Sequence, residues 1–134
     1  MTAPRRAYPQ LLLVVLLAAC HSDPNSPQGV AERFVDQHYV MIDVKAAKPF
    51  STGLALRKLE NEEKLTTGHS IDAATRKPTV HYRLIEKRDS PEQPAFVFEG
   101  TIYADGDDSF TRKWLITTRR DGDAWKVSNF EEYE

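Results

Sequence analysis

The sequence has a single cysteine, Cys20, among 134 residues, so no disulfide bond can form within one chain. It has no excess of basic residues either, because 18 Lys and Arg stand against 20 Asp and Glu and the basic side chains are scattered. A concentrated positive patch is therefore excluded, and we expect no nucleic-acid partner. None of the four histidines has another histidine four residues away, the spacing of helical zinc sites, and we expect neither a metal nor another cofactor.

The sequence also lacks an apolar run long enough to cross a bilayer. Its longest is residues 11–19, nine uncharged apolar or small residues, against the roughly 20 that a transmembrane helix needs. Arg5 and Arg6 precede this run and no acidic residue accompanies them, which is the charge pattern of a segment that directs export. Residues 1–19 are therefore predicted to be a signal peptide.

The signal segment ends in Leu17-Ala18-Ala19-Cys20, which resembles the lipobox of bacterial lipoproteins. The resemblance implies cleavage between Ala19 and Cys20 and attachment of a diacylglycerol to the thiol of Cys20, so that the lipid holds the mature protein on the bacterial cell membrane. The alternative is an ordinary secretory leader with a cysteine near its cleavage point. Position 21 is His21 and not the aspartate that favours inner-membrane retention, so the outer membrane is favoured if the source has two membranes.

The chain then divides into three parts: residues 1–19 are removed, residues 20–27 form a lipidated tether, and residues 28–134 form one domain. Two prolines and several polar residues keep the tether extended and solvated. Removal of the leader leaves 16 basic against 20 acidic residues, a formal charge of −4. Apolar residues at 40 % and charged residues at 28 % are typical of a soluble globular domain, which can form a core.

Two amphipathic helices are predicted in the first half of the domain. Ser26 and Pro27 give the first a cap and a proline at its first position. Its apolar stripe comprises Val30, Ala31, Phe34, Val35, Tyr39, Met41 and Ile42. A short helical turn is expected between Asp43 and Pro49. A second helix follows residues 51–53 and ends at Gly68. Its stripe comprises Leu54, Leu56, Leu59 and Leu65.

After Pro78 the apolar period changes to two, which is typical of strands that pack one face against a core. Four strands are predicted, over residues 79–87, 95–104, 110–120 and 124–130. The residues predicted to face the core are Val80, Tyr82, Leu84, Phe96, Phe98, Ile102, Trp114, Ile116, Trp125 and Val127. Asp121-Gly122 is a strong hairpin signal, and connections this short require antiparallel neighbours. Glu131, Glu132 and Glu134 are interpreted as a solvated acidic tail.

Helices followed by an antiparallel meander indicate an α+β fold in which the helices pack on one face of a curved sheet of about four strands. The element order and the closing Asp121-Gly122-Asp123-Ala124-Trp125-Lys126-Val127 segment are similar to the nuclear transport factor two-like fold, which includes SnoaL-like and ketosteroid isomerase-like proteins. This resemblance covers roughly residues 27–134 and implies a cone formed by sheet and helices. No catalytic motif accompanies it.

Enzymes of that fold place acidic, basic or hydroxyl groups inside the cone. The candidate pocket residues are therefore His38, Tyr39, Asp43, Tyr82, Phe98 and Trp114. His81 alternates with core residues and is expected on the opposite face of the sheet. Residues 105–108 carry three aspartates, but an EF-hand-like loop from Asp105 would place Ile116 at its last ligand position, so a hairpin turn is favoured over calcium.

Two hypotheses for function follow. The first is a non-catalytic envelope lipoprotein whose domain binds or assembles with an envelope protein partner. The second is a small-molecule-binding protein or an isomerase-like or dehydratase-like enzyme that uses the cone cavity. A cone filled by Trp114, Phe98 and Leu59 would count against the second. The sequence does not specify the oligomeric state.

Overall fold

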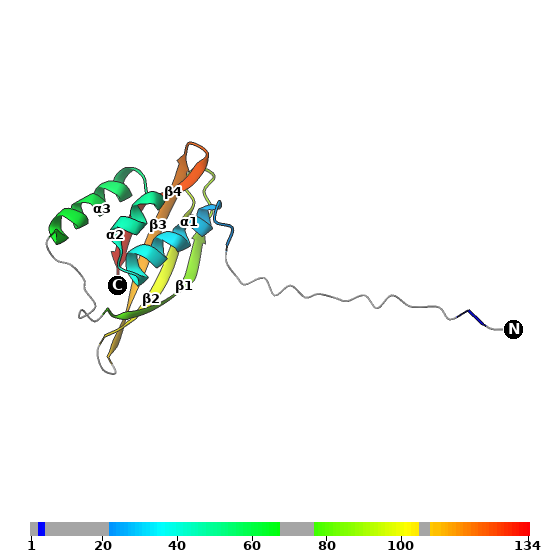
Figure 1. The fold of residues 1–134 in the computed structure, drawn as a ribbon, viewed down its shortest axis with the longest axis horizontal. Coiled ribbons are helices and arrows are strands. Elements are labelled where there is room, and N and C mark those ends of the chain that lie inside the picture. The colour runs from blue at the N-terminus through cyan, green and yellow to red at the C-terminus, as the bar shows by residue number, and fades with distance from the viewer. Residues whose placement is uncertain (1–2, 5–21, 68–76, 105–107) are drawn as a thin grey trace.

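The computed structural model of this chain describes residues 3–4, 22–67, 77–104 and 108–134. The lipobox, the predicted helix end at Gly68 and the aspartate-rich turn at residues 105–107 lie outside the described residues. Helices cover one face of a four-stranded antiparallel sheet (Figure 1). The predicted α+β fold is therefore confirmed. Among the described residues, no helix has both the length and the apolar character that a membrane crossing requires.

Helix α1 (Pro27–Val35) begins where the sequence predicts. The Ser26 hydroxyl accepts a hydrogen bond from the Gly29 amide at 3.0 Å, and Pro27 occupies the first helical position. The same hydroxyl donates to the Asp23 carbonyl at 2.6 Å, so the start of the domain is fixed to the end of the preceding segment. The buried side of α1 comprises Gly29, Val30, Ala31, Phe34 and Val35, as its apolar stripe predicts.

The first helix does not continue as a regular α-helix to Ile42. It widens at Asp36 into a π-helical turn, η1 (Asp36–Val40), closed by a 2.8 Å hydrogen bond from the Met41 amide to the Asp36 carbonyl. Met41 is then 52 % exposed, and Ile42 adopts a left-handed φ of +54° that is rare for a β-branched residue. The prediction that these two residues extend the buried stripe is wrong, because the inserted turn rotates them away from the sheet.

The next elements are α2 (Val44–Ala47), the 3-10 turn η2 (Lys48–Phe50) and α3 (Gly53–Thr66). The short predicted helical turn is confirmed as α2. In α3, Leu59 and Ala55 are fully buried, whereas Leu65 is 81 % exposed and Leu54 is also exposed. The predicted leucine stripe is thus only partly correct, because the residues at the two ends of α3 are exposed and only its middle packs in the core.

The strands are β1 (Thr79–Arg88), β2 (Ala95–Tyr103), β3 (Ser109–Asp121) and β4 (Ala124–Tyr133), and their order in the sheet is their order in the chain. Gly122 turns the last hairpin with a φ of +64°, as the Asp121-Gly122 signal predicts. The register shifts between Leu84 and Glu86 on β1 and opposite Thr117 and Thr118 on β4. Such bulges increase the local twist and curve the sheet around the helices.

Strand β4 is longer than predicted and includes residues 131–133, so Glu131 and Glu132 are exposed, as predicted for a solvated acidic tail, but they belong to the sheet and not to a tail. Lys113–Tyr133, Trp114–Glu132 and Leu115–Glu131 are paired across β3 and β4. The backbone of this segment therefore continues the sheet ladder, although the glutamate side chains stay largely in solvent.

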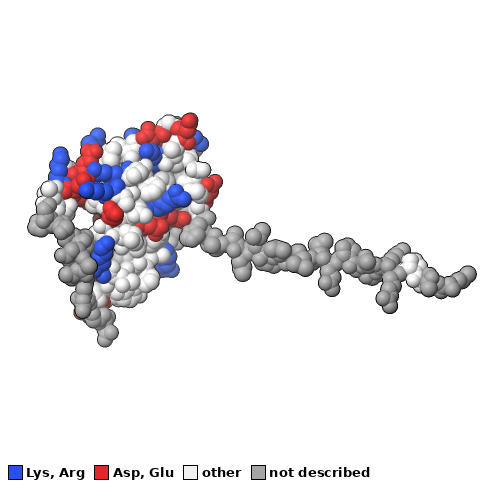
Figure 2. Space-filling view, viewed as in Figure 1, with Lys and Arg blue, Asp and Glu red and all other residues white. Residues whose placement is uncertain are grey.

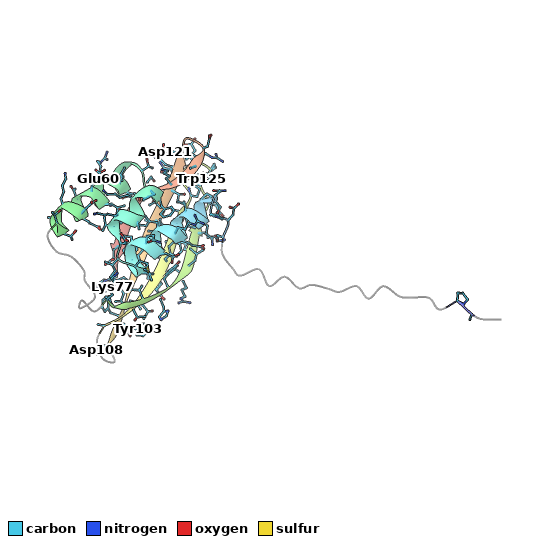
Figure 3. All side chains as sticks on the ribbon, viewed as in Figure 1. Glu60, Lys77, Tyr103, Asp108, Asp121 and Trp125 are labelled. Atoms are coloured by element: carbon cyan, nitrogen blue, oxygen red, sulfur yellow. The ribbon has the colours of Figure 1, made fainter. Side chains whose placement is uncertain are left out.

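The core lies between α1, α3 and the inner face of the sheet. Its largest fully buried side chains include Trp114, Phe34, Phe98, Leu59 and Ile116. Trp125, predicted for the same face, is only half-buried and lies at the hairpin end beneath the Arg120 guanidinium, which is 5.0 Å from its ring (Figure 3). The bulge on β4 begins only after Val127, which is fully buried.

Gly100 on β2 leaves room for the Trp114 indole. A Cβ atom at position 100 would lie 2.1 Å from Cη2 of Trp114, well inside van der Waals contact. We therefore expect Gly100→Ala to lower the free energy of unfolding by about 2–3 kcal/mol through overpacking, measured by urea denaturation. Gly122→Asn is the control, since that site is open and asparagine tolerates a left-handed φ. An unchanged unfolding midpoint for Gly100→Ala would show that Trp114 is not held there.

Candidate functional site

A groove of about 620 Å³ lies between η1, α3 and the C-terminal end of β4. It is lined by His38, Tyr39, Lys58, Glu62, Phe130, Glu131, Glu132 and Tyr133. Three of these side chains are carboxylates, one is an ammonium and three are phenyl or phenol rings. Because polar groups converge here on an aromatic surface, we take this groove as the candidate site.

The π-helical turn puts two consecutive side chains, His38 and Tyr39, into this groove. The Tyr39 ring stacks on the Trp114 indole with centroids 4.1 Å apart and planes at 11°. The His38 ring packs beside Phe130 at 4.8 Å and beside Tyr39 at 4.4 Å. π-helical turns are rare and recur at functional sites, because the extra residue redirects neighbouring side chains. Here it supplies both ring surfaces of the groove from one turn of chain.

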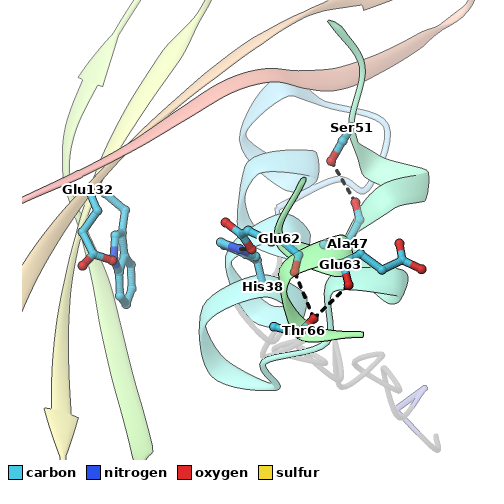
Figure 4. A network of polar contacts seen from close by, with 8 residues as sticks. His38, Ala47, Ser51, Glu62, Glu63, Thr66 and Glu132 are labelled. Carbon is cyan, nitrogen blue, oxygen red and sulfur yellow. Dashed lines mark hydrogen bonds and ion pairs between the residues drawn. The ribbon is translucent and has the colours of Figure 1, made fainter. Parts of the chain in front are cut away.

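His38 and Glu62 form the closest polar pair across the groove wall. His38 Nε2 lies 2.8 Å from Glu62 Oε2, and the His38 side chain is only 10 % exposed (Figure 4). Of the two neutral tautomers, the one protonated on Nε2 donates this hydrogen bond. Nδ1 is buried without a hydrogen-bond partner among the described residues. The neighbouring Glu63 points to the other side of α3, where its bond with Lys48 lowers the pKa of the Glu63 carboxyl.

On the sheet side, Trp114 and Glu132 are directly paired residues of β3 and β4. The Trp114 indole N–H donates to Glu132 Oε2 at 2.9 Å, which satisfies the one polar atom of an otherwise buried ring. Glu132 Oε1 lies 3.7 Å from Arg112 Nε, with both side chains partly exposed. One carboxylate oxygen is thus fixed by the core, while the other faces a solvated ion pair.

Tyr39 lies between the two carboxylates. Burial raises the pKa of its phenol far above the ordinary value, and the negative charges of Glu132 and Glu62 raise it further. Tyr39 is therefore a neutral hydroxyl at every physiological pH. It can donate a hydrogen bond, but it cannot act as a phenolate base.

Lys58 closes the groove on the α3 side. Its ammonium donates to Asn129 Oδ1 and to the Phe130 carbonyl, both at 2.8 Å, and lies 5.2 Å from the centroid of the Phe130 ring. β4 is an edge strand, so these bonds, with the Thr52 amide bonded to the Val127 carbonyl at 2.8 Å, cover part of its exposed edge.

Of the six candidate pocket residues from the sequence, the structure brings His38 and Tyr39 to the groove. Trp114 and Phe98 are fully buried in the core beneath it. Asp43 caps α2 by accepting from the Ala46 amide at 3.0 Å. Tyr82 donates a 2.6 Å hydrogen bond to Asp36 Oδ1. His81 is exposed and packs near Tyr103, with ring centroids 5.7 Å apart, on the face opposite the helices.

Sequence reasoning missed Lys58, Glu62, Phe130 and Glu132 as groove residues. Lys58 and Glu62 are four positions apart and therefore share one face of α3, a signal that was available. The position of Glu132 could not be predicted in this way, because the bulge on β4 shifts the inward and outward alternation of side chains after Val127. Across the described part of the chain, no group of three or more His, Cys, Asp and Glu side chains is arranged to hold a metal.

Comparison with known proteins identifies the fold but no family. No protein-family model and no curated protein matches the sequence. A solved structure from Thiobacillus denitrificans, described as a calcium/calmodulin-dependent protein kinase type II association domain, superposes with a TM-score of 0.61 at 9 % identity, covering 80 % of this chain and 93 % of that one. Agrobacterium tumefaciens VirB8 gives 0.55 at 10 % identity, covering 79 % and 88 %. The chain therefore has a nuclear transport factor two-like fold, as its sequence predicts.

The raised pKa of Tyr39 predicts how stability depends on pH. The unfolded chain releases this phenol proton near pH 10, whereas the folded chain retains it. The contribution of the protonated Tyr39 phenol to the free energy of unfolding is fully present below pH 10. It decreases as the pH rises above 10, by about 1.4 kcal/mol per pH unit. We expect Tyr39→Phe to remove this contribution to the fall in the free energy of unfolding between pH 10 and 11.5, measured by urea denaturation at each pH. The difference between wild type and variant at pH 8 is the reference. Parallel wild-type and variant curves would contradict the assignment.

Proposed function

We propose that this chain is a lipid-anchored bacterial envelope protein whose domain binds another envelope protein and is not an enzyme. The observation that carries the second part is the filled cone. Trp114, Phe98 and Leu59 are each fully buried and pack in one core cluster, so the space in which enzymes of this fold hold substrate is occupied by side chains.

The polar groups also argue against catalysis. A general base must reach the proton that it removes, within about 3 Å or through one water. His38 Nδ1, the nitrogen not used by Glu62, has almost no solvent-accessible surface. Asp43 and Tyr82 are engaged in structural hydrogen bonds away from the groove. The best candidate dyad, His38 with Glu62, thus has no open nitrogen to offer a substrate.

The position of the groove suits a protein partner. Pro24 and Asn25, where the chain enters the domain, lie against residues 123–126 at the start of β4. The groove is at the other end of the same strand, at residues 130–133. With a rise of about 3.3 Å per residue, the two ends are roughly 20 Å apart. A domain tethered at Cys20 would hold the groove away from the membrane, open to a partner.

Two further observations support a binding role. The similar structure from Thiobacillus denitrificans has the same fold and is described as an association domain. Charges of both signs are mixed over the face drawn in Figure 2, with no broad positive area for nucleic acid.

The lipobox-like segment supports a lipid anchor, in the outer membrane if the source has two membranes.

The anchor is tested by Cys20→Ala in the native host. We expect the wild-type protein to partition into detergent and to begin, by mass spectrometry, at an acylated Cys20, because several acyl chains together give stable membrane attachment. The variant should carry no acyl mass and accumulate uncleaved or soluble. Ser22→Ala, two positions away, is the control and should be lipidated. Unchanged detergent partitioning of Cys20→Ala would refute the anchor.

The binding role is tested by crosslinking the anchored wild-type protein in intact cells, followed by purification in detergent. A partner protein recovered in stoichiometric amount would support the proposal. A tightly bound small molecule without any crosslinked protein would overturn it in favour of a ligand-binding or enzymatic domain.

A further inference from the structure

We infer that the groove between α3 and β4 is a receptor for a basic side chain, an arginine or lysine, presented by the partner protein. This rests on the proposed binding function and specifies the chemistry of the partner at its contact point. The inference depends on two fixed carboxylates, an aromatic surface between them and an ammonium already held in the same groove.

The two carboxylates are held in place by hydrogen bonds from ring nitrogens. Glu62 Oε2 is bonded to His38 and Glu132 Oε2 to Trp114, at 2.8 and 2.9 Å, and both donors are deeply buried. Their side chains are nevertheless 40 % and 48 % exposed. Each glutamate therefore holds a partly solvated oxygen in a fixed position. Because the glutamate side chains are already ordered, they lose little conformational entropy when a cation binds.

Aromatic rings form the surface between these carboxylates. Tyr39 is fixed by its stacking on Trp114, and Phe130 packs against both His38 and Tyr39. The negative face of such rings attracts a guanidinium or an ammonium. The planar guanidinium of arginine can also bond a carboxylate with two N–H groups, which makes arginine the stronger of the two candidates.

Lys58 shows how the groove accommodates a cation. Its ammonium has two oxygen acceptors and lies near the ring of Phe130, so neutral oxygens and one ring hold a cation at one end of the groove. The groove lining has one ammonium, that of Lys58, and three carboxylates, so its net charge is negative. The carboxylates are those of Glu62, Glu131 and Glu132. Arg112 approaches Glu132 only at 3.7 Å, with both groups partly in solvent, an ion pair worth at most about 1 kcal/mol.

The buried His38 ring holds one of the two carboxylates in place. Its side chain is nine-tenths buried at the groove wall, and Nδ1 has no partner within the described part of the chain. An unsatisfied buried nitrogen costs stability, of the order of 1–3 kcal/mol. Nε2 bonds to Glu62, so the hydrogen bond that His38 makes is the one that orients this carboxylate.

The test uses the full chain in mild detergent with ¹⁵N-labelled tryptophan indoles. The probe is a capped pentapeptide carrying two arginines, and the comparison peptide carries citrulline, which keeps the shape and removes the charge. Because the Trp114 N–H is bonded to Glu132, its resonance should shift saturably with the arginine peptide. The resonance of Trp125, at the opposite end of β4, should not move (Figure 3).

Glu62→Gln and Glu132→Gln keep a hydrogen-bond acceptor and remove the charge. We expect each to weaken peptide binding by about threefold to fivefold, and the double variant by about tenfold. Glu60→Gln is the matched control, because this glutamate lies on the solvent side of the same helix and its replacement changes the net charge equally (Figure 3). Its affinity should equal that of the wild type.

Several results would overturn the inference: no saturable shift at millimolar peptide, an equal shift with the citrulline peptide, or an equal loss in Glu60→Gln. Free arginine amide binding as tightly as the peptide would also do so, since it would indicate a small-molecule site. None of these outcomes tests the lipid anchor or the crosslinked partner, so the proposed function is measured independently of the arginine site. Absent acylation of Cys20 or absent crosslinking would refute that function even where the arginine peptide binds.

Discussion

The contact between the Trp114 indole and the Tyr39 ring is the constraint on which the rest of the structure depends. The two rings stack at 4.1 Å, and the indole reaches Glu132 through its only N–H. β2 makes room for it at Gly100, where any side chain would collide with the ring. One side chain of β3 thereby fixes the helical layer, the neighbouring strand and the edge strand together. Among the described residues, Trp114, Phe98 and Leu59 are fully buried in one cluster, so large side chains occupy the interior between sheet and helices.

The filled interior has a consequence for chemistry. In an open cone, acid and base groups are held in a low-dielectric cavity, where their pKa values shift and substrate is enclosed. Here the rings that could shape such a cavity pack on one another, and the polar groups lie outside them in a groove between α3 and β4. Burial and the nearby carboxylates keep the Tyr39 phenol neutral, so it contributes shape and one hydroxyl.

The fold was predictable because its signals are local. The cap at Ser26, the change of period after Pro78 and the Asp121-Gly122 turn each act over a few residues, and all three recur in the structure. The groove could not be predicted in the same way, because two local irregularities form it. The π-helical turn at Asp36–Val40 and the bulge in β4 each insert one residue into a regular period. A regular period allows for neither insertion, so Met41 and Ile42 were placed inward and Glu132 was placed in a tail, although the spacing of three from Val127 to Phe130 marks the bulge.

These two irregularities also explain why the groove residues come together. In η1 the wider π-helical turn places His38 and Tyr39 together at the groove, where both rings lie near Phe130. Without the bulge, residues 130–132 would present the opposite faces of the strand, and Glu132 would point away from Trp114. An inserted residue costs regular hydrogen bonding at each place. Both interruptions affect the same groove, and both also serve the core, because Phe130 belongs to the core cluster and Tyr39 packs against it.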